Sequence, residues 1–221
     1  MKLILSFTLI WMLSSTAAAL QCLQDRHSHI PVLEQCDSDD ELCATTALHG
    51  DTEGEVSQHT LRSCAPSSLC TVQGQILSNS VAFLKRAASV HCCNTDGCNS
   101  QNFTYPDLQT KLNGLQCLSC THRPDPVCNG TVQCAGVEDR CFDGNWTAGG
   151  DTFPWCGCAS ANMCEVLSHL KVRTAFAAYP PFDLNLTRAP RCCGSSFCNS
   201  AGTVKLSVGP VLLGLIVLVL Y

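Results

Sequence analysis

Closely spaced cysteines and histidines are the residues of this chain whose types and spacing could carry chemistry. The run Cys117-Leu118-Ser119-Cys120 has the Cys-x-x-Cys spacing of a redox dithiol. Cys156-Gly157-Cys158, and the pair His27 and His29, have spacings that a metal ion could share. Nineteen cysteines in 221 residues, however, indicate a disulfide scaffold, and oxidised cysteines cannot ligate zinc. We therefore predict no catalytic residue, no metal and no cofactor, and the sequence has no Gly-x-Ser-x-Gly or His-Glu-x-x-His motif.

A repeat organises the cysteines. Residues 92–99 and residues 192–199 both read Cys-Cys, four residues, Cys-Asn, and Leu-Gln-Cys occurs at both residues 20–22 and residues 115–117. The chain therefore holds two copies of one cysteine-rich unit. Each copy has about 80 residues, near the size at which a core alone gives marginal stability and disulfides are needed.

The first 19 residues have the features of a secretory signal peptide. Lys2 precedes an apolar run, and three alanines stand before Leu20, where cleavage is expected. Secretion would place the chain in the oxidising compartment that its cysteines require.

A second apolar run covers residues 208–221 and follows small residues at 200–202 and a polar spacer. Together these features form the signal for a glycosylphosphatidylinositol anchor. The apolar run has 14 residues, whereas a membrane-spanning helix needs about 20. We expect residues 200–221 to be the anchor signal, which is removed, and the lipid to be attached at Ser200 or Asn199.

The cysteine spacing of the second copy is specific. It combines Leu-x-Cys-x-x-Cys at residues 115–120, six residues between Cys134 and Cys141, Gly-Cys followed by five residues before Cys164, and the closing Cys-Cys-x4-Cys-Asn. The series resembles the Ly6/urokinase-receptor family of three-finger domains over residues 115–199. The resemblance implies an all-β, disulfide-rich fold of two tandem three-finger (snake-toxin-like) domains: domain one at 20–100, a linker at 101–114, and domain two at 115–199.

The resemblance also implies a disulfide pairing. Domain two would contain Cys117–Cys141, Cys120–Cys128, Cys134–Cys158, Cys164–Cys192 and Cys193–Cys198. Domain one lacks the second and third cysteines of the family, and Asp25 stands in place of the second, which leaves Cys22–Cys43, Cys36–Cys64, Cys70–Cys92 and Cys93–Cys98. Without that pair, we expect the first finger of domain one, around residues 27–34, to be the looser first finger.

Cys156 is the cysteine without a family partner. Gly157 before Cys158 favours Cys158 as the family cysteine, although Cys156 and Cys158 could exchange roles. We predict that Cys156 is a free thiol, is capped by glutathione, or links two chains as a dimer.

The segments between cysteines are expected to form two-stranded fingers. Residues 71–90 carry apolar positions among polar ones, and residues 60–63 indicate the end of a strand. Residues 165–178 have some helical spacing, but the family resemblance implies a strand there.

Charge is concentrated in domain one. Residues 21–100 contain ten acidic and four basic residues, for −6, whereas residues 115–199 contain seven and six, for −1. The formal charge of −5 for the whole chain argues against a nucleic-acid partner. Asp37, Asp39 and Glu41 are candidates for attracting a basic protein, and a solvated face is the simpler alternative.

Aromatic side chains and glycosylation motifs mark domain two. Trp155 and Tyr179 are candidate partner-binding residues if exposed, because Trp and Tyr are frequent in binding hot spots. Asn-x-Thr motifs predict glycans, which must face water, at Asn102, Asn129, Asn145 and Asn185.

These observations together predict a non-enzymatic, lipid-anchored protein on the extracellular face of the plasma membrane, and the resemblance to the Ly6/urokinase-receptor family implies a receptor or adhesion role. Its partner would be an extracellular or membrane protein bound through the finger loops. The alternative is a secreted binding protein similar to phospholipase inhibitors, and shedding is compatible with either function. A disulfide-exchange enzyme that uses Cys117 and Cys120 is a third hypothesis.

Overall fold

The computed structural model describes residues 19–25, 30–169, 185–186 and 189–200. The predictions for the signal peptide, for His27 and His29, for Tyr179 and for the segment after Ser200 lie outside these residues. The expectation of a looser first finger in domain one also falls partly outside them.

Domain one consists of three antiparallel hairpins, the fingers, that extend from one disulfide-rich end. The first finger has its own two-stranded sheet, and the second and third share a larger one. The elements are β1 (Gln21–Gln24), β2 (Val32–Gln35), β3 (Glu41–Thr52), β4 (Glu55–Pro66), α2 (Ser67–Cys70), β5 (Ile76–Val81), β6 (Leu84–Cys93) and the short 3-10 helix η1 (Cys98–Ser100).

Domain two repeats this plan, so the predicted tandem three-finger fold is confirmed. The elements are β7 (Leu112–Ser119), β8 (Gly130–Ala135), β9 (Arg140–Ala148), β10 (Asp151–Ala159), α3 (Ala161–Ser168), β11 (Asn185–Leu186) and β12 (Arg191–Cys193). The strand implied for residues 165–178 is wrong for residues 165–168, where the chain is still helical. Met163 and Val166 give α3 a buried face, and residues 170–178 lie outside the described part.

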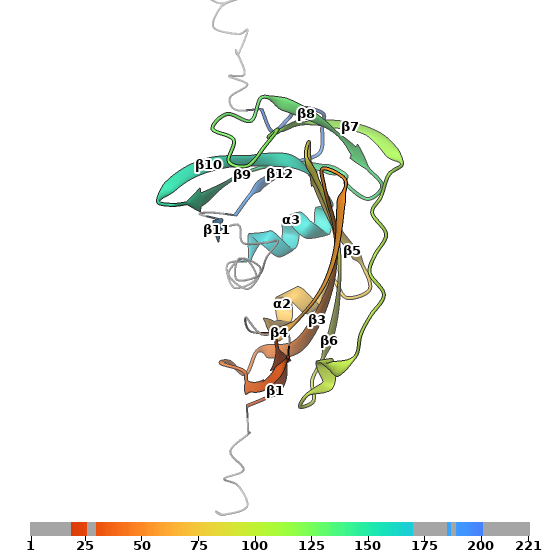
Figure 1. The fold of residues 1–221 in the computed structure, drawn as a ribbon, viewed down its shortest axis with the longest axis vertical. Helices are drawn as coiled ribbons and strands as arrows, with labels where there is room; N and C mark the ends of the chain where they lie inside the picture. The colour runs from red at the N-terminus through yellow and green to blue at the C-terminus, as the bar shows by residue number, and fades with distance from the viewer. Residues whose placement is uncertain (1–18, 26–29, 170–184, 187–188, 201–221) are drawn as a thin grey trace, which may run out of the picture.

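One sheet runs through both domains. Its strand order is β11-β9-β10-β5-β6-β3-β4, with β12 also paired to β9. The domains join where β10 pairs antiparallel with β5, with Cys158 opposite Ser80 and Ala159 opposite Asn79. In Figure 1 the long strands of domain one run down the molecule and β9 and β10 cross its upper end, with α2 and α3 on the same side of the sheet.

The apolar core is shared by the two domains. Leu77, Val81 and Val90 of domain one belong to the same buried cluster as Trp155 and Val166 of domain two. Each domain also has one smaller cluster at its base, built mainly of disulfide-bonded cysteines. Because the main cluster crosses the domain boundary, the two domains bury apolar surface against each other as well as within themselves.

Nine disulfides join the same cysteine pairs that the family resemblance implies. The asparagine after the last cysteine of each copy completes each base. Asn99 donates from Nδ2 to the carbonyls of Leu23 and Ala44, and its Oδ1 accepts from the Leu23 amide. Asn199 makes the equivalent bonds to residues 118 and 142. The buried amide thus ties the first finger to the second, which explains the Cys-Asn ending of the repeat.

Polar contacts lock the junction between the domains. The buried carboxylate of Glu138 accepts hydrogen bonds from the hydroxyls of Ser78 (2.9 Å) and Ser80 (2.8 Å). The Ser160 amide donates to the Ser78 carbonyl, and its hydroxyl accepts from the Ser78 amide. At Gly157 a Cβ atom would overlap the Ser80 carbonyl oxygen, so only glycine permits this approach of β10 to β5.

The connecting segment, residues 101–111, packs on domain one. The Phe103 ring stacks on His91 with ring centroids 3.7 Å apart, and the Tyr105 and Thr60 hydroxyls are hydrogen-bonded. His49 is hydrogen-bonded through Nδ1 to the Pro106 carbonyl. Figure 1 shows this segment on the side of the sheet opposite α2 and α3.

Candidate protein-binding surfaces

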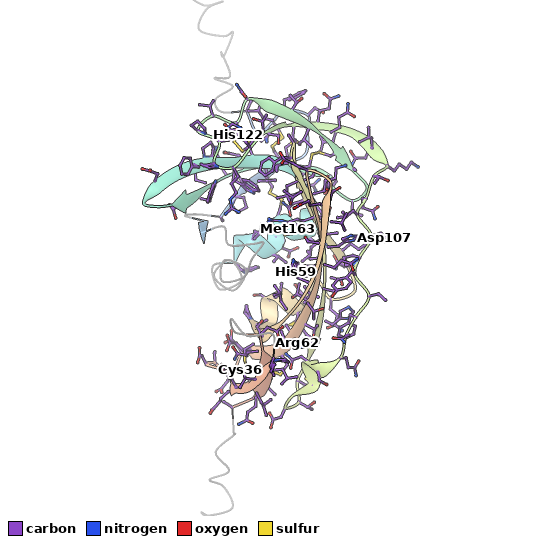
Figure 2. All side chains as sticks on the ribbon, viewed as in Figure 1. Cys36, His59, Arg62, Asp107, His122 and Met163 are labelled. Carbon is purple, nitrogen blue, oxygen red and sulfur yellow. A yellow bond between two sulfur atoms is a disulfide. The ribbon has the colours of Figure 1, made fainter. Side chains whose placement is uncertain are left out.

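The acidic loop, residues 37–41, turns between β2 and β3 at the outer end of domain one, directly after Cys36 (Figure 2). Asp37 and Asp39 are exposed, as the prediction requires. Glu41 is only half exposed, and its Oε2 accepts hydrogen bonds from the amides of Asp37 (3.0 Å) and Ser38 (3.2 Å). Glu41 therefore shapes the loop, and Asp37, Asp39 and Asp40 are its exposed carboxylates.

Exposed apolar side chains lie on the first finger beside this loop. Val32 and Leu33 are neighbours on β2 and are 49% and 48% exposed, so both faces of the strand contact solvent. Ile30, just before β2, is 75% exposed. Sequence reasoning missed this patch because three apolar residues near a cysteine are equally compatible with a small core.

A second acidic group lies at the tip of the β3–β4 hairpin. Asp51 Oδ1 accepts a hydrogen bond from the Gly54 amide, and Glu53 has a positive φ of 53° in the tight turn. The tip meets the turn between β5 and β6, because the Glu53 amide donates to the Phe83 carbonyl. A cavity of about 360 Å³ opens here and is lined by Asp51, Glu53, Gly54, Ala82, Phe83, Leu84, Lys85 and Thr121.

This cavity combines carboxylates, one lysine and an aromatic ring, and Thr121 of domain two closes one side of it. Sequence reasoning did not predict that Phe83, Lys85 and Thr121 lie together here. No local pattern could have found them, because the packing of one domain against the other brings them together.

Trp155 is not an exposed anchor, and this part of the binding prediction is wrong. The side chain is 4% exposed and meets the Phe83 ring edge to face, with centroids 6.0 Å apart. Trp146 is also buried, against Phe153 and under the Arg123 guanidinium at 4.4 Å. These rings bury apolar area inside the molecule, so no partner can reach them in this fold.

The cysteines of the Cys-x-x-Cys motif are bonded to different partners, Cys117 to Cys141 and Cys120 to Cys128, and do not form a redox pair with each other. Three groups of cysteine sulfurs are close enough to share a metal. In these groups every sulfur except that of Cys156 belongs to a disulfide, so the described residues do not offer a set of thiolate ligands.

Cys156 is free and buried, with 4% of its surface exposed. Burial raises the pKa of its thiol to about 12, and the carboxylates of Asp143 and Asp125 act in the same direction. The thiol lies out of reach of a second chain, so the structure does not support the predicted dimer link through this residue.

The glycosylation motifs are distributed over the linker and domain two. Asn102 and Asn129 are exposed, and Asn145 is half-buried on β9. Asn185 begins β11 opposite Thr147, so two motifs lie near the same end of β9.

The candidate lipid-attachment residues end the last described segment. Asn199 is 7% exposed and fully engaged in the base of domain two, whereas the half-exposed Ser200 donates its amide to the Phe197 carbonyl. Among the described residues, the Asn199 side chain makes hydrogen bonds to residues 118 and 142, and the Ser200 side chain makes none. No helix in the described residues is long and apolar enough to cross a bilayer.

Comparison with known proteins places the chain in a family. One solved structure, of mouse TEX101, is similar at 16% sequence identity, covering 80% of this chain and 96% of that one with a TM-score of 0.28. The u-PAR/Ly-6 domain model matches twice, at residues 19–101 and 113–201, which is most of the sequence. The two matches agree with the two copies seen in the cysteine pattern and in the strand order, and the chain belongs to the u-PAR/Ly-6 domain family.

Proposed function

We propose that the chain is a non-enzymatic, glycosylphosphatidylinositol-anchored glycoprotein of the cell surface, which binds a protein ligand or co-receptor through domain one. Proteins of this family are typically cell-surface binding proteins. The observation that carries the proposal is the separation of charge from glycosylation motifs. Domain one has a formal charge of −6 and no Asn-x-Ser/Thr motif, whereas all four motifs lie in the linker and domain two. An unshielded acidic surface attracts a basic partner.

The position of the acidic loop supports the same proposal. β1 and the loop after Cys36 lie at one end of the molecule, and the last described segment, which follows β12, lies at the other end (Figures 1 and 2). A lipid attached at Ser200 would hold domain two at the membrane and leave the outer end of domain one free. The first finger, whose strand β2 leads into the acidic loop, adds the exposed apolar side chains of Val32 and Leu33, and protein interfaces commonly combine apolar and charged groups.

A binding screen with the glycosylated ectodomain, residues 20–199, on intact cells tests the proposal. The double variant Asp37→Asn, Asp39→Asn should bind more slowly than wild type, and added salt should slow the wild type. The control Asp151→Asn, Glu165→Gln removes the same charge from exposed positions of domain two and should bind as wild type. Binding that is indifferent to salt and to neutralisation of Asp37, Asp39 and Glu41 would reject the acidic surface.

A further inference from the structure

Three sulfur atoms meet beneath the first finger of domain two. Cys120 is bonded to Cys128, and the free Cys156 sulfur lies 3.9 Å from that of Cys120. All three sulfurs are within 4.8 Å of one another, and all three residues are buried. We call these three residues the sulfur cluster.

The backbone already holds Cys120 and Cys156 side by side. The Cys120 amide donates to the Cys156 carbonyl at 3.4 Å, and the Cys156 amide donates to the Cys120 sulfur at 3.4 Å. To bond, the two sulfurs would have to approach by about 2 Å, because a disulfide is about 2.05 Å long. Because these backbone contacts already hold the two residues side by side, we expect side-chain rotation to bring the sulfurs together.

Domain one makes the same contact with different chemistry. Asp25 stands in the place of Cys120, and Arg62, two residues before Cys64, matches Cys156, two residues before Cys158. The Asp25 amide donates to the Arg62 carbonyl at 3.0 Å, and the Arg62 amide donates to Asp25 Oδ2 at 2.7 Å. The side chains also form an ion pair at 3.7 Å. A direct side-chain link between the first and second fingers at this position is therefore compatible with the fold.

We propose that the sulfur cluster is a thiol–disulfide exchange site, at which domain two converts its Cys120–Cys128 bond into a Cys120–Cys156 bond. The Cys156 thiol loses its proton to water, and the thiolate attacks Cys120 Sγ. The Cys120–Cys128 bond breaks, and the departing Cys128 thiolate takes up a proton. One disulfide and one thiol are present before and after, so no oxidant or reductant is consumed.

Exchange would move the free thiol to Cys128, which is 7% exposed in the described fold but has exposed residues on both sides of it in the chain. Cys128 stands between Val127, which is 64% exposed, and the exposed Asn129. The short loop that its disulfide closes would open, and Cys128 would become available for a mixed disulfide with another protein or a small thiol.

Two features make the exchange slow in the resting fold. The thiol is almost wholly protonated near neutral pH, since burial and the carboxylates of Asp125 and Asp143 raise its pKa. Those carboxylates are themselves paired, with His122 at 3.8 Å and Arg191 at 2.5 Å. In addition, in-line attack on Cys120 would place the entering and leaving sulfurs about 6 Å apart, assuming an ordinary bond length. The three sulfurs lie within 4.8 Å of one another, so the Cys156 thiol lies beside the Cys120–Cys128 bond and not in line with it.

Mapping of the thiol and the disulfides in the purified full chain tests the proposal. The protein is incubated without reductant, alkylated with N-ethylmaleimide, quenched in acid, digested and analysed by mass spectrometry. We expect maleimide on Cys128 together with a Cys120–Cys156 cross-linked peptide, both forming about tenfold faster per pH unit, in proportion to the thiolate. The Cys156→Ser variant should give neither product.

A second variant makes the test independent of rate. Cys128→Ser leaves Cys120 and Cys156 as the two cysteines of the cluster, and they should be recovered bonded to each other in secreted protein. If Cys128→Ser is not secreted, the wild-type time course decides. Wild-type protein alkylated only at Cys156, with no Cys120–Cys156 peptide at any pH, would overturn the proposal.

Discussion

Glu138 of domain two accepts a hydrogen bond from the Ser80 hydroxyl of domain one at 2.8 Å, inside the junction. The same carboxylate accepts from the Ser78 hydroxyl and from the Ala135 amide. A buried carboxylate with three donors, two of them from the other domain, couples the position of domain two to β5. The junction is therefore specified by polar contacts as well as by apolar packing.

Removal of this carboxylate should weaken the junction. Glu138→Ala leaves the Ser80 hydroxyl and the Ala135 amide without this acceptor, while the Ser78 hydroxyl keeps the Arg86 carbonyl at 3.2 Å. We expect a cost of about 2 kcal/mol of unfolding free energy. Glu138→Gln keeps one acceptor and should lose less. Chemical denaturation measures the loss, and the exposed Glu165→Gln serves as control. Equal stability of Glu138→Ala and wild type would show that the contact is not used in solution.

A methyl group at Gly157 should separate β10 from β5. The added Cβ overlaps the Ser80 carbonyl and lies 3.0 Å from Val81 Cγ1, so Gly157→Ala should cost about 1–3 kcal/mol. Hydrogen exchange of the Ser160 amide, which donates to the Ser78 carbonyl at 2.9 Å, should accelerate. Gly144→Ala, on the neighbouring strand, meets Pro190 at an ordinary 3.4 Å and should leave that exchange unchanged. Unaltered protection in Gly157→Ala would contradict the pairing.

The stacked pair His91 and Phe103 should make stability depend on pH. Burial lowers the pKa of His91 from its ordinary value of 6.5, so the folded state favours the neutral ring. The contribution of His91 to the unfolding free energy is therefore complete above the unfolded-state pKa of about 6.5. It is lost as the pH falls through the lower folded-state pKa. His91→Phe should flatten the difference in unfolding free energy between neutral and mildly acidic pH. A wild-type profile as flat as that of the variant would refute this.

The buried Cys156 thiol should produce the opposite pH dependence. Its pKa rises from 9.0 in the unfolded chain to about 12 in the fold, so its contribution to stability is complete below pH 9.0 and declines above it. The decline should be about 1.4 kcal/mol per pH unit until the folded-state pKa is reached. Urea denaturation with short incubation gives the unfolding free energies of wild type and Cys156→Ala at each pH. Subtracting one from the other cancels the contributions of the other groups that titrate at alkaline pH. Parallel curves above pH 9.0 would mean that the thiol is not buried in solution.

The cysteine spacing was sufficient to find the two repeats and the resemblance to the Ly6/urokinase-receptor family, and that resemblance implied the tandem three-finger fold. A disulfide framework leaves characteristic intervals between cysteines in the sequence. The structure explains the Cys-Asn endings, because the side-chain amides of Asn99 and Asn199 donate hydrogen bonds to carbonyls of the second finger. Gly157 was interpreted only as a marker for Cys158. Its physical role, the close approach to Ser80, depends on a strand pairing between domains that no local pattern encodes.

The binding residues were harder to predict for the same reason. Trp155 is buried because Phe83 of the other domain covers it, and Glu41 turns its carboxylate to its own loop. The concentration of charge in domain one follows from counting residues and needs no knowledge of contacts. Which carboxylates face outward depends on the hydrogen bonds of the loop, and Asp37 and Asp39 are left exposed.

Release from intact cells by phosphatidylinositol-specific phospholipase C is the most direct measurement of the proposed surface role. The anchored protein should leave the membrane on treatment and carry the anchor remnant at Ser200 or Asn199. A variant with charged residues in the apolar segment, Leu213→Arg and Ile216→Arg, should not become anchored. Protein that stays on treated cells, or that occurs only in the medium without lipid as a secreted inhibitor would, contradicts the account.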